Sequence, residues 1–106
     1  MSKIYQRTTA RRDLIEHFMY LAENAGLEIA DKFLENTEAS FNDLASQPMM
    51  GMPLITHHPD LVGIRKWHVK DFDNYLIFYL PSSNSISIVR LLHATRDWWG
   101  LLGLKY

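Results

Sequence analysis

The chain has 106 residues, of which 47% are hydrophobic and 22% charged, a balance that is typical of one globular domain and argues against disorder. It contains no cysteine, which excludes disulfides and thiolate zinc sites and fits the cytoplasm. Neither a signal peptide nor a membrane span is predicted. Residues 1–60 carry five Lys or Arg against nine Asp or Glu, a balance of −4, and residues 61–106 carry six against three, a balance of +3. This asymmetry is weaker than that of a dedicated nucleic-acid binder, although the second half could meet an acidic partner.

The first half of the chain is predicted to form a short strand and a helical hairpin. Residues 3–7 alternate weakly and suit a strand. Apolar residues in the range 9–25 recur at helical spacing, with Thr8 or Thr9 as the expected N-cap and Gly26 as the left-handed residue that ends the helix. A second helix follows until Ser46, and its expected apolar face comprises Ile29, Ala30, Phe33, Leu34, Phe41, Leu44 and Ala45. The short connection requires the two helices to be antiparallel.

Residues 47–60 are predicted to be an irregular connector, since they contain three prolines and a glycine. The three methionines Met49, Met50 and Met52 are expected to fill gaps beneath it. His57 and His58 are expected on the surface, and no metal site is predicted, because no further ligand stands at a suitable spacing.

The second half is predicted to be an antiparallel meander of three strands. The first covers residues 61–70, and its apolar residues change parity between Ile64 and Trp67, which indicates a bulge or burial on both faces. The range 75–80 is apolar throughout and should be the most buried strand, and Ile86 to Leu92 forms the third. The helical hairpin should cover one face of this sheet, so residues 1–106 are expected to form a single α+β domain.

The end of the last strand and the residues after it contain most of the charged and aromatic side chains that could form a functional site: Arg90, His93, Arg96, Asp97, Trp98 and Trp99. Two adjacent indoles cannot easily bury on the same side, so one of them is expected at a protein interface. The apolar tail that follows, with Leu101 and Leu102, either packs back onto the sheet or is covered by a partner.

These residues permit two interpretations. RNA cleavage would need a base or acid and cationic phosphate clamps, and His93 with Arg65, Arg90 and Arg96 could supply them, supported by Lys66, Lys70 or Tyr79. Alternatively, Arg65, Arg90 and Asp97 form an ion-paired network that only orders the sheet, with Asp97 bound to Arg96 or Arg90. The residues alone favour the structural role, above all for Asp97.

The order of these segments resembles the ParE/RelE superfamily of bacterial toxins, specifically its ParE-like branch. The resemblance covers nearly the whole chain and rests on five patterns: Ala30 with Phe33, Leu44-Ala45 with Pro48 and Gly51, Leu61 with Arg65, Tyr75 with Tyr79, and Val89 to His93 with Arg96 and Asp97. No single pattern is specific, but their order and spacing together are.

The resemblance implies the toxin of a type II toxin–antitoxin module, which inhibits growth, stabilises plasmids in some settings, and is neutralised by an antitoxin protein. ParE-like members inhibit DNA gyrase by binding it, whereas RelE-like members cut messenger RNA on the ribosome. We expect the ParE-like activity, in a cytoplasmic protein without a cofactor or metal that forms a hetero-oligomer with its antitoxin and does not bind membranes. Antitoxin or target contacts are expected from Arg65, Arg90, His93, Arg96, Asp97, Trp98, Trp99, Leu101 and Leu102. The alternatives are a ribosome-dependent endoribonuclease and a degenerate relative that only binds its antitoxin.

Overall fold

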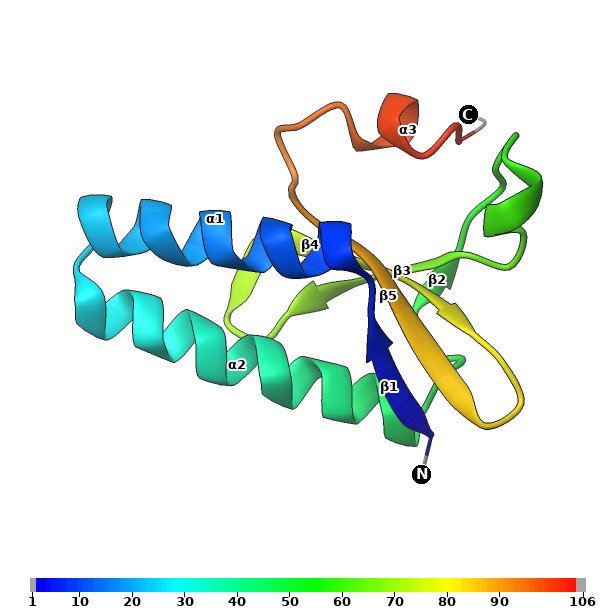
Figure 1. The fold of residues 1–106 in the computed structure, drawn as a ribbon, viewed down its shortest axis with the longest axis horizontal. Helices are drawn as coiled ribbons and strands as arrows, with labels where there is room; N and C mark the ends of the chain where they lie inside the picture. Colours follow the sequence, from blue (N-terminus) through cyan, green and yellow to red (C-terminus); the bar gives the residue numbers. More distant parts are fainter. Residues whose placement is uncertain (1, 105–106) are drawn as a thin grey trace.

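In the computed structural model, which describes residues 2–104, a helical hairpin lies against a five-stranded sheet (Figure 1). The elements in chain order are β1 (Lys3–Gln6), α1 (Thr8–Asn24), α2 (Leu27–Ser46), β2 (Met52–Pro53), the 3₁₀ turn η1 (Pro59–Leu61), β3 (Arg65–Val69), β4 (Phe72–Pro81), β5 (Ser85–His93) and α3 (Trp98–Leu101). The sheet order is β1-β5-β4-β3-β2. The predicted α+β class and the antiparallel meander β3–β4–β5 are confirmed. The first strand lies at the edge of the sheet, parallel to β5.

The two helices begin and end where the backbone geometry requires it. Gly26 has φ of 100° and separates the helices as predicted. The expected N-cap was wrong, because the residue before α1 is Arg7, which makes no side-chain cap. Its backbone N–H instead donates to the Ile88 carbonyl at 3.0 Å, so the chain stays extended in the sheet until the helix starts at Thr8. Within residues 2–104, no helix is long and apolar enough to cross a bilayer.

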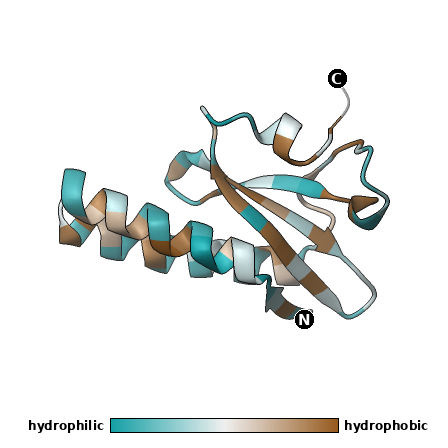
Figure 2. Cartoon of the chain, turned by 45° about the horizontal axis from the view of Figure 1, so that its top comes forward, coloured by the Kyte–Doolittle hydropathy of each residue, from teal (hydrophilic) through white to brown (hydrophobic). Residues whose placement is uncertain are grey.

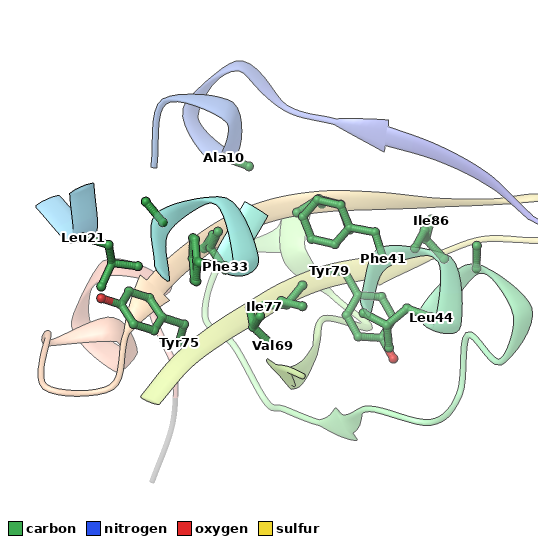
Figure 3. Close-up of a cluster of buried hydrophobic side chains, with 14 residues drawn as sticks. Ala10, Leu21, Phe33, Phe41, Leu44, Val69, Tyr75, Ile77, Tyr79 and Ile86 are labelled. Carbon is green, nitrogen blue, oxygen red and sulfur yellow. The ribbon is translucent and has the colours of Figure 1, made fainter. Parts of the chain in front are cut away.

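Strand β4 divides the core into two layers, because its side chains alternate between the faces of the sheet. Tyr75, Ile77 and Tyr79 face the helices and pack with Phe33 and other helical residues (Figure 3). Leu76 and Phe78 face the opposite side. The five residues from Tyr75 to Tyr79 are all buried, which confirms the prediction for this strand.

The helical hairpin is amphipathic, and brown and teal segments alternate along both helices in Figure 2. Ala30, Phe33, Phe41, Leu44 and Ala45 are buried as expected for α2. Two residues of the predicted face differ: Leu34 is only half-buried, and Ile29 is 40% exposed, because it lies in the first turn of α2, near the tip of the hairpin.

Strand β3 contains an irregularity of register, but it lies between His68 and Val69 and not between Ile64 and Trp67, where the sequence indicated it. It begins at Arg65, later than expected, because η1 and the left-handed Gly63, with φ of 93°, interrupt the extended chain. Beyond the bulge, α2 takes over the edge of the strand. The Lys70 N–H donates to Ser40 Oγ at 2.9 Å, and the Lys70 carbonyl accepts a hydrogen bond from Asn36 Nδ2 at 3.1 Å.

The connector is more ordered than predicted, since Met52 and Pro53 pair with β3 as strand β2. The expectation for its methionines was right for one of three. Met50 packs against the helix-side core, but Met49, in the turn before β2, is 67% exposed, and Met52, on the edge strand β2, is 50% exposed.

The C-terminal segment packs back onto the face of the sheet that the helices leave open. Leu102 and Leu104 are buried there with Phe78, Val89 and Leu92. The segment is tied to the connector by an isolated bridge between Thr56 and Leu104 and by a 2.7 Å hydrogen bond from Thr56 Oγ1 to the Leu102 carbonyl. Of the two expectations for the tail, packing onto the sheet is therefore the observed one; residues 105–106 lie outside the described residues.

Candidate functional site

Arg90 is held by α1. Asp13 Oδ2 accepts a 2.7 Å hydrogen bond from Arg90 Nε, and Asp13 Oδ1 accepts one of 3.0 Å from Arg90 Nη2. The two side chains are only 6% and 19% exposed, and the hydrogen bond to Asp13 raises the pKa of the Arg90 guanidinium above its usual value. The predicted pairing of Arg90 with Asp97 was wrong, because Arg90 faces α1 whereas Asp97 lies in the segment that crosses the other face of the sheet.

The position of Asp13 follows from the end of β1. The last pair between β1 and β5 is Gln6 with Ile88, so the edge of β5 has no strand neighbour after that point. There the Leu91 N–H donates to Asp13 Oδ2 at 3.1 Å, and His17 Nε2 lies 2.7 Å from the Leu91 carbonyl. Because a carbonyl only accepts, Nε2 of His17 carries a proton. Two side chains one turn apart on α1 thus replace the missing strand.

His93 stands at the end of β5, opposite Tyr75 in the sheet. Its Nδ1 accepts a 3.2 Å hydrogen bond from the Thr95 N–H and lies 2.8 Å from Thr95 Oγ1. A backbone N–H only donates, so Nδ1 is unprotonated and Nε2 carries the proton of the neutral ring. In this tautomer His93 can donate through Nε2 but cannot act there as a general base. Its ring also packs edge-on against Tyr75, with centroids 5.0 Å apart.

Arg65 fastens the connector. Its Nη1 donates to the carbonyls of Met49 at 3.1 Å and Gly51 at 2.6 Å. Tyr79, which pairs with Arg65 in the sheet, donates its hydroxyl proton to the Pro48 carbonyl at 2.7 Å and accepts the Gly51 N–H at 2.9 Å. Burial raises the pKa of the Tyr79 hydroxyl, which therefore stays protonated and able to donate.

The residues considered for RNA cleavage are not all brought together. Arg65 pairs with Tyr79, and His93 pairs with Tyr75, four residues away along β4. Four residues of strand span about 13 Å, and Arg65 and His93 lie on opposite sides of β4. Arg90 is already bound by Asp13. Arg96 is exposed and lies beside His93, because its N–H donates to the His93 carbonyl at 3.0 Å. Of the four candidate residues, His93 and Arg96 are therefore close together, whereas Arg65 and Arg90 do not join them to hold a scissile phosphate.

The segment after β5 forms a small platform. Asp97 Oδ1 accepts the Gly100 N–H at 3.1 Å and so caps the single turn of α3. Neither of the two ion pairs within residues 2–104 involves Asp97, so its expected pairing with Arg96 or Arg90 is not observed. Trp98 packs on Phe78, with ring centroids 5.4 Å apart, and Lys66 Nζ lies 4.9 Å from its ring centroid.

Three exposed side chains cover this platform, and we call Arg96, Trp99 and Leu101 the C-terminal surface. Trp99 is 37% exposed and Leu101 43% exposed, whereas Leu102 is buried beneath them. The two indoles are divided as expected, one facing the sheet and one facing outward, with their rings at 77°. Leu102, expected among the interacting residues, is instead part of the core that supports this surface. In the described part of the chain, no three His, Asp or Glu side chains gather as a metal site would require.

A shallow groove runs between the two helices, beside Gln6 at the end of β1. Leu14, Ile15 and Phe18 of α1 and Leu34 of α2 line it, with Arg11 and Glu38 at its rim, and its volume is about 330 Å³. Ile15 and its neighbour Met19, one turn further along α1, are 50% and 55% exposed. Apolar side chains exposed in one stripe on a helix are typical of a surface that a partner covers.

Residues 4–98 match the protein-family model described as ParE toxin of type II toxin-antitoxin system, parDE. The fold is also similar to that of a solved chain titled "Chromosomal ParDE TA system from P. aeruginosa". The TM-score is 0.70 and the sequence identity 17%, over 88% of this chain and 96% of that chain, so this similarity concerns the fold. No curated protein matches the chain.

Proposed function

The chain belongs to the family of ParE toxins of type II toxin–antitoxin systems, and from this premise we propose that it inhibits DNA gyrase by binding it and is neutralised by a cognate antitoxin of the ParD type. The observation that carries the proposal is that the candidate site residues fall into two groups, one with structural contacts and one exposed on the surface. Arg65 and Arg90 serve the fold, while Trp99 and Leu101 remain exposed on a platform that Asp97 and Trp98 hold in place. A surface of this kind suits protein binding better than catalysis.

The C-terminal surface is the part that we assign to the target. It combines an indole, an aliphatic side chain and an arginine, which are residue types that dominate protein interfaces. Other residues of the chain hold this surface in place: Leu102 and Leu104 are buried beneath the segment, and the connector is bound to it through the Thr56–Leu104 bridge. Trp99→Ala with Leu101→Ala should therefore remove the contact without unfolding the domain.

The groove between α1 and α2 is the part that we assign to the antitoxin. Its apolar floor and its exposed stripe of Ile15 and Met19 suit the apolar face of an amphipathic helix. Arg11 and Glu38 at the rim of the groove would pair with residues of opposite charge beside the apolar face of such a helix. Both interactions would take place in the cytoplasm, where gyrase acts.

Two variants separate these assignments. Induced without antitoxin, Trp99→Ala/Leu101→Ala should lose most of its toxicity and still bind the antitoxin. Ile15→Glu should remain toxic but escape neutralisation, because a charge in the groove opposes an apolar partner. Leu27→Ala and Leu27→Glu, at a residue that is 62% exposed at the tip of the hairpin, are the matched controls. Full toxicity of the folded double variant would refute the assignment of the C-terminal surface.

The target itself is tested by two readouts after induction of the wild-type chain: the DNA damage response and mapped cleavage of messenger RNA. DNA damage with intact transcripts, together with inhibition of supercoiling by the purified toxin, would support gyrase. Codon-phased cuts without primary DNA damage would refute it and favour the endoribonuclease, for which His93→Ala is the next variant. Binding to the antitoxin without any toxicity would indicate a degenerate relative.

A further inference from the structure

A pocket outside both proposed interfaces lies where α1 passes the ends of β4 and β5. Glu16, His17 and Tyr20 line it from α1, Tyr75 from β4, and His93 and Thr95 from the end of β5. Its volume is about 380 Å³, near the lower end of the range for ligand pockets, and it is open to solvent. Such a pocket has room for one side chain of a partner.

The floor of the pocket holds a phenol hydroxyl without a protein partner. Tyr75 is only 8% exposed, and among residues 2–104 its hydroxyl has no hydrogen-bond partner. In Figure 3 the hydroxyl points away from the other side chains of the core cluster. The ring is fixed between His17 and His93, each with its centroid 5.0 Å away in an edge-on contact. Among the described side chains, Gln6 Nε2 is the atom that is both buried and unpaired, so the Tyr75 hydroxyl reaches solvent, and a ligand could replace the water at this group.

The negative charge of Glu16 makes the pocket more favourable for a cation than for an anion. Glu16 forms no ion pair within the described residues, and neither lysine nor arginine lines the pocket. Arg90, on the neighbouring part of β5, is committed to Asp13. Burial lowers the pKa of His17, so this imidazole adds no positive charge near neutral pH. The Glu16 carboxylate attracts Arg90 only over a longer distance, where it helps to raise the pKa of that guanidinium, so an anion in the pocket would be repelled by Glu16 and a cation attracted.

We propose that this pocket receives the guanidinium group of an arginine presented by a partner protein. The Glu16 carboxylate would accept its N–H groups, the Tyr75 hydroxyl would accept another, and the exposed Tyr20 ring would stack on its planar face. Lysine fits less well, because a compact ammonium group cannot bind the carboxylate in a fork and stack on a phenol at once. The proposal does not depend on gyrase being the target.

The direct test is a titration of the full chain with Nα-acetyl-arginine amide, followed by NMR signals of the His93 and Tyr75 rings. The expected result is a saturable shift with a dissociation constant in the millimolar range, as befits one side chain without the rest of its protein. Nα-acetyl-citrulline amide has nearly the same shape without the charge and should bind several-fold more weakly. Equal binding of the two amides, or no saturable shift with arginine, would overturn the proposal.

Variants locate the site. Glu16→Gln removes the charge and Tyr75→Phe removes only the hydroxyl, and each should weaken arginine binding by about 5- to 10-fold, the usual scale for the net contribution of one solvent-accessible hydrogen bond. Glu23→Gln, at an exposed residue of the same helix that does not line the pocket, should bind as the wild type does. If Tyr75→Phe is unstable, Tyr20→Leu at the exposed rim replaces it. Wild-type affinity in folded Glu16→Gln would contradict the assignment.

Discussion

The ion pair between Asp13 and Arg90 should dominate the stability of the contact between α1 and the sheet. Asp13→Ala would remove three hydrogen bonds, two from the guanidinium and one from the Leu91 N–H, and would leave a guanidinium that is 19% exposed without its counter-charge. Breaking a buried pair on one side costs about 3–5 kcal/mol. For a domain with a total stability of about 5–15 kcal/mol, this is a large fraction.

Urea denaturation measures this loss as a lower midpoint at an unchanged slope. Asp31→Ala on the exposed face of α2 is the control and should change the free energy of unfolding by less than about 0.5 kcal/mol. The double variant Asp13→Asn/Arg90→Met removes both charges and keeps an acceptor for the Leu91 N–H, so it should be more stable than Asp13→Ala. A loss below about 1 kcal/mol for Asp13→Ala would refute the reasoning, because the pair would then behave like an exposed one.

Three further outcomes are expected from the same measurement. The pKa of His17 lies below its ordinary 6.5 in the folded state because of burial, so the unfolded chain binds more protons and stability should fall as the pH drops through about 6.5; His17→Gln should flatten this fall. Tyr79→Phe should cost about 1–3 kcal/mol, because a buried Gly51 N–H loses its acceptor, and Tyr5→Phe, at an exposed tyrosine, should be neutral. Ser40→Ala should cost about as much as Tyr79→Phe, since it leaves the Lys70 N–H unpaired.

Each of these outcomes can fail in a definite way. An equal pH dependence in wild type and His17→Gln would assign the acid sensitivity to other groups. If Tyr79→Phe and Tyr5→Phe unfold at the same urea concentration, Tyr79 does not hold the connector. A neutral Ser40→Ala would mean that water satisfies Lys70 as well as Ser40 does.

The layout of the fold could be predicted because each segment carries a strong local signal. Helical spacing marks the hairpin, Gly26 marks its turn, and the unbroken apolar run from Tyr75 marks the central strand. The place of β1 in the sheet has no such signal. Either edge strand of the sheet could pair with β1. The pairing with β5 joins residues that are far apart in the sequence, so no local pattern indicates it.

The roles of the charged residues were harder to predict, since the sequence does not show which residue a charged side chain will pair with in the fold. Asp13 was missed because acidic residues on a helix usually face water. A signal was nevertheless present: Ala10, Asp13, His17 and Leu21 lie at i, i+3, i+7 and i+11, so two polar residues interrupt a buried stripe. Polar residues in such positions indicate a buried hydrogen-bonding task. Asp97 was misassigned for the opposite reason, because its partner is a backbone N–H three residues away.

The two helices use the same device on two strands. On α1, Asp13 and His17 bind the N–H and carbonyl of Leu91; on α2, Ser40 and Asn36 bind those of Lys70. In each case the helical residues are four apart, the spacing that places two side chains on one face. We call each of these two pairs of helical side chains a clamp. Each clamp binds the chain just after a change of register in the sheet, one between Phe78 and Tyr79 and one between His68 and Val69. Beyond these points, no further strand within residues 2–104 pairs with the edge that the clamp binds.

This arrangement ties the hairpin to the sheet by specific hydrogen bonds as well as by apolar packing, and all of them lie on the helical side. The C-terminal surface is built on the other side, from the connector and the tail, and it shares only strands with the clamps. Changes at sites without common partners usually add independently. Substitutions at Trp99, in the proposed target surface, should therefore leave the proposed antitoxin groove intact, which would allow the two partners to recognise the toxin separately.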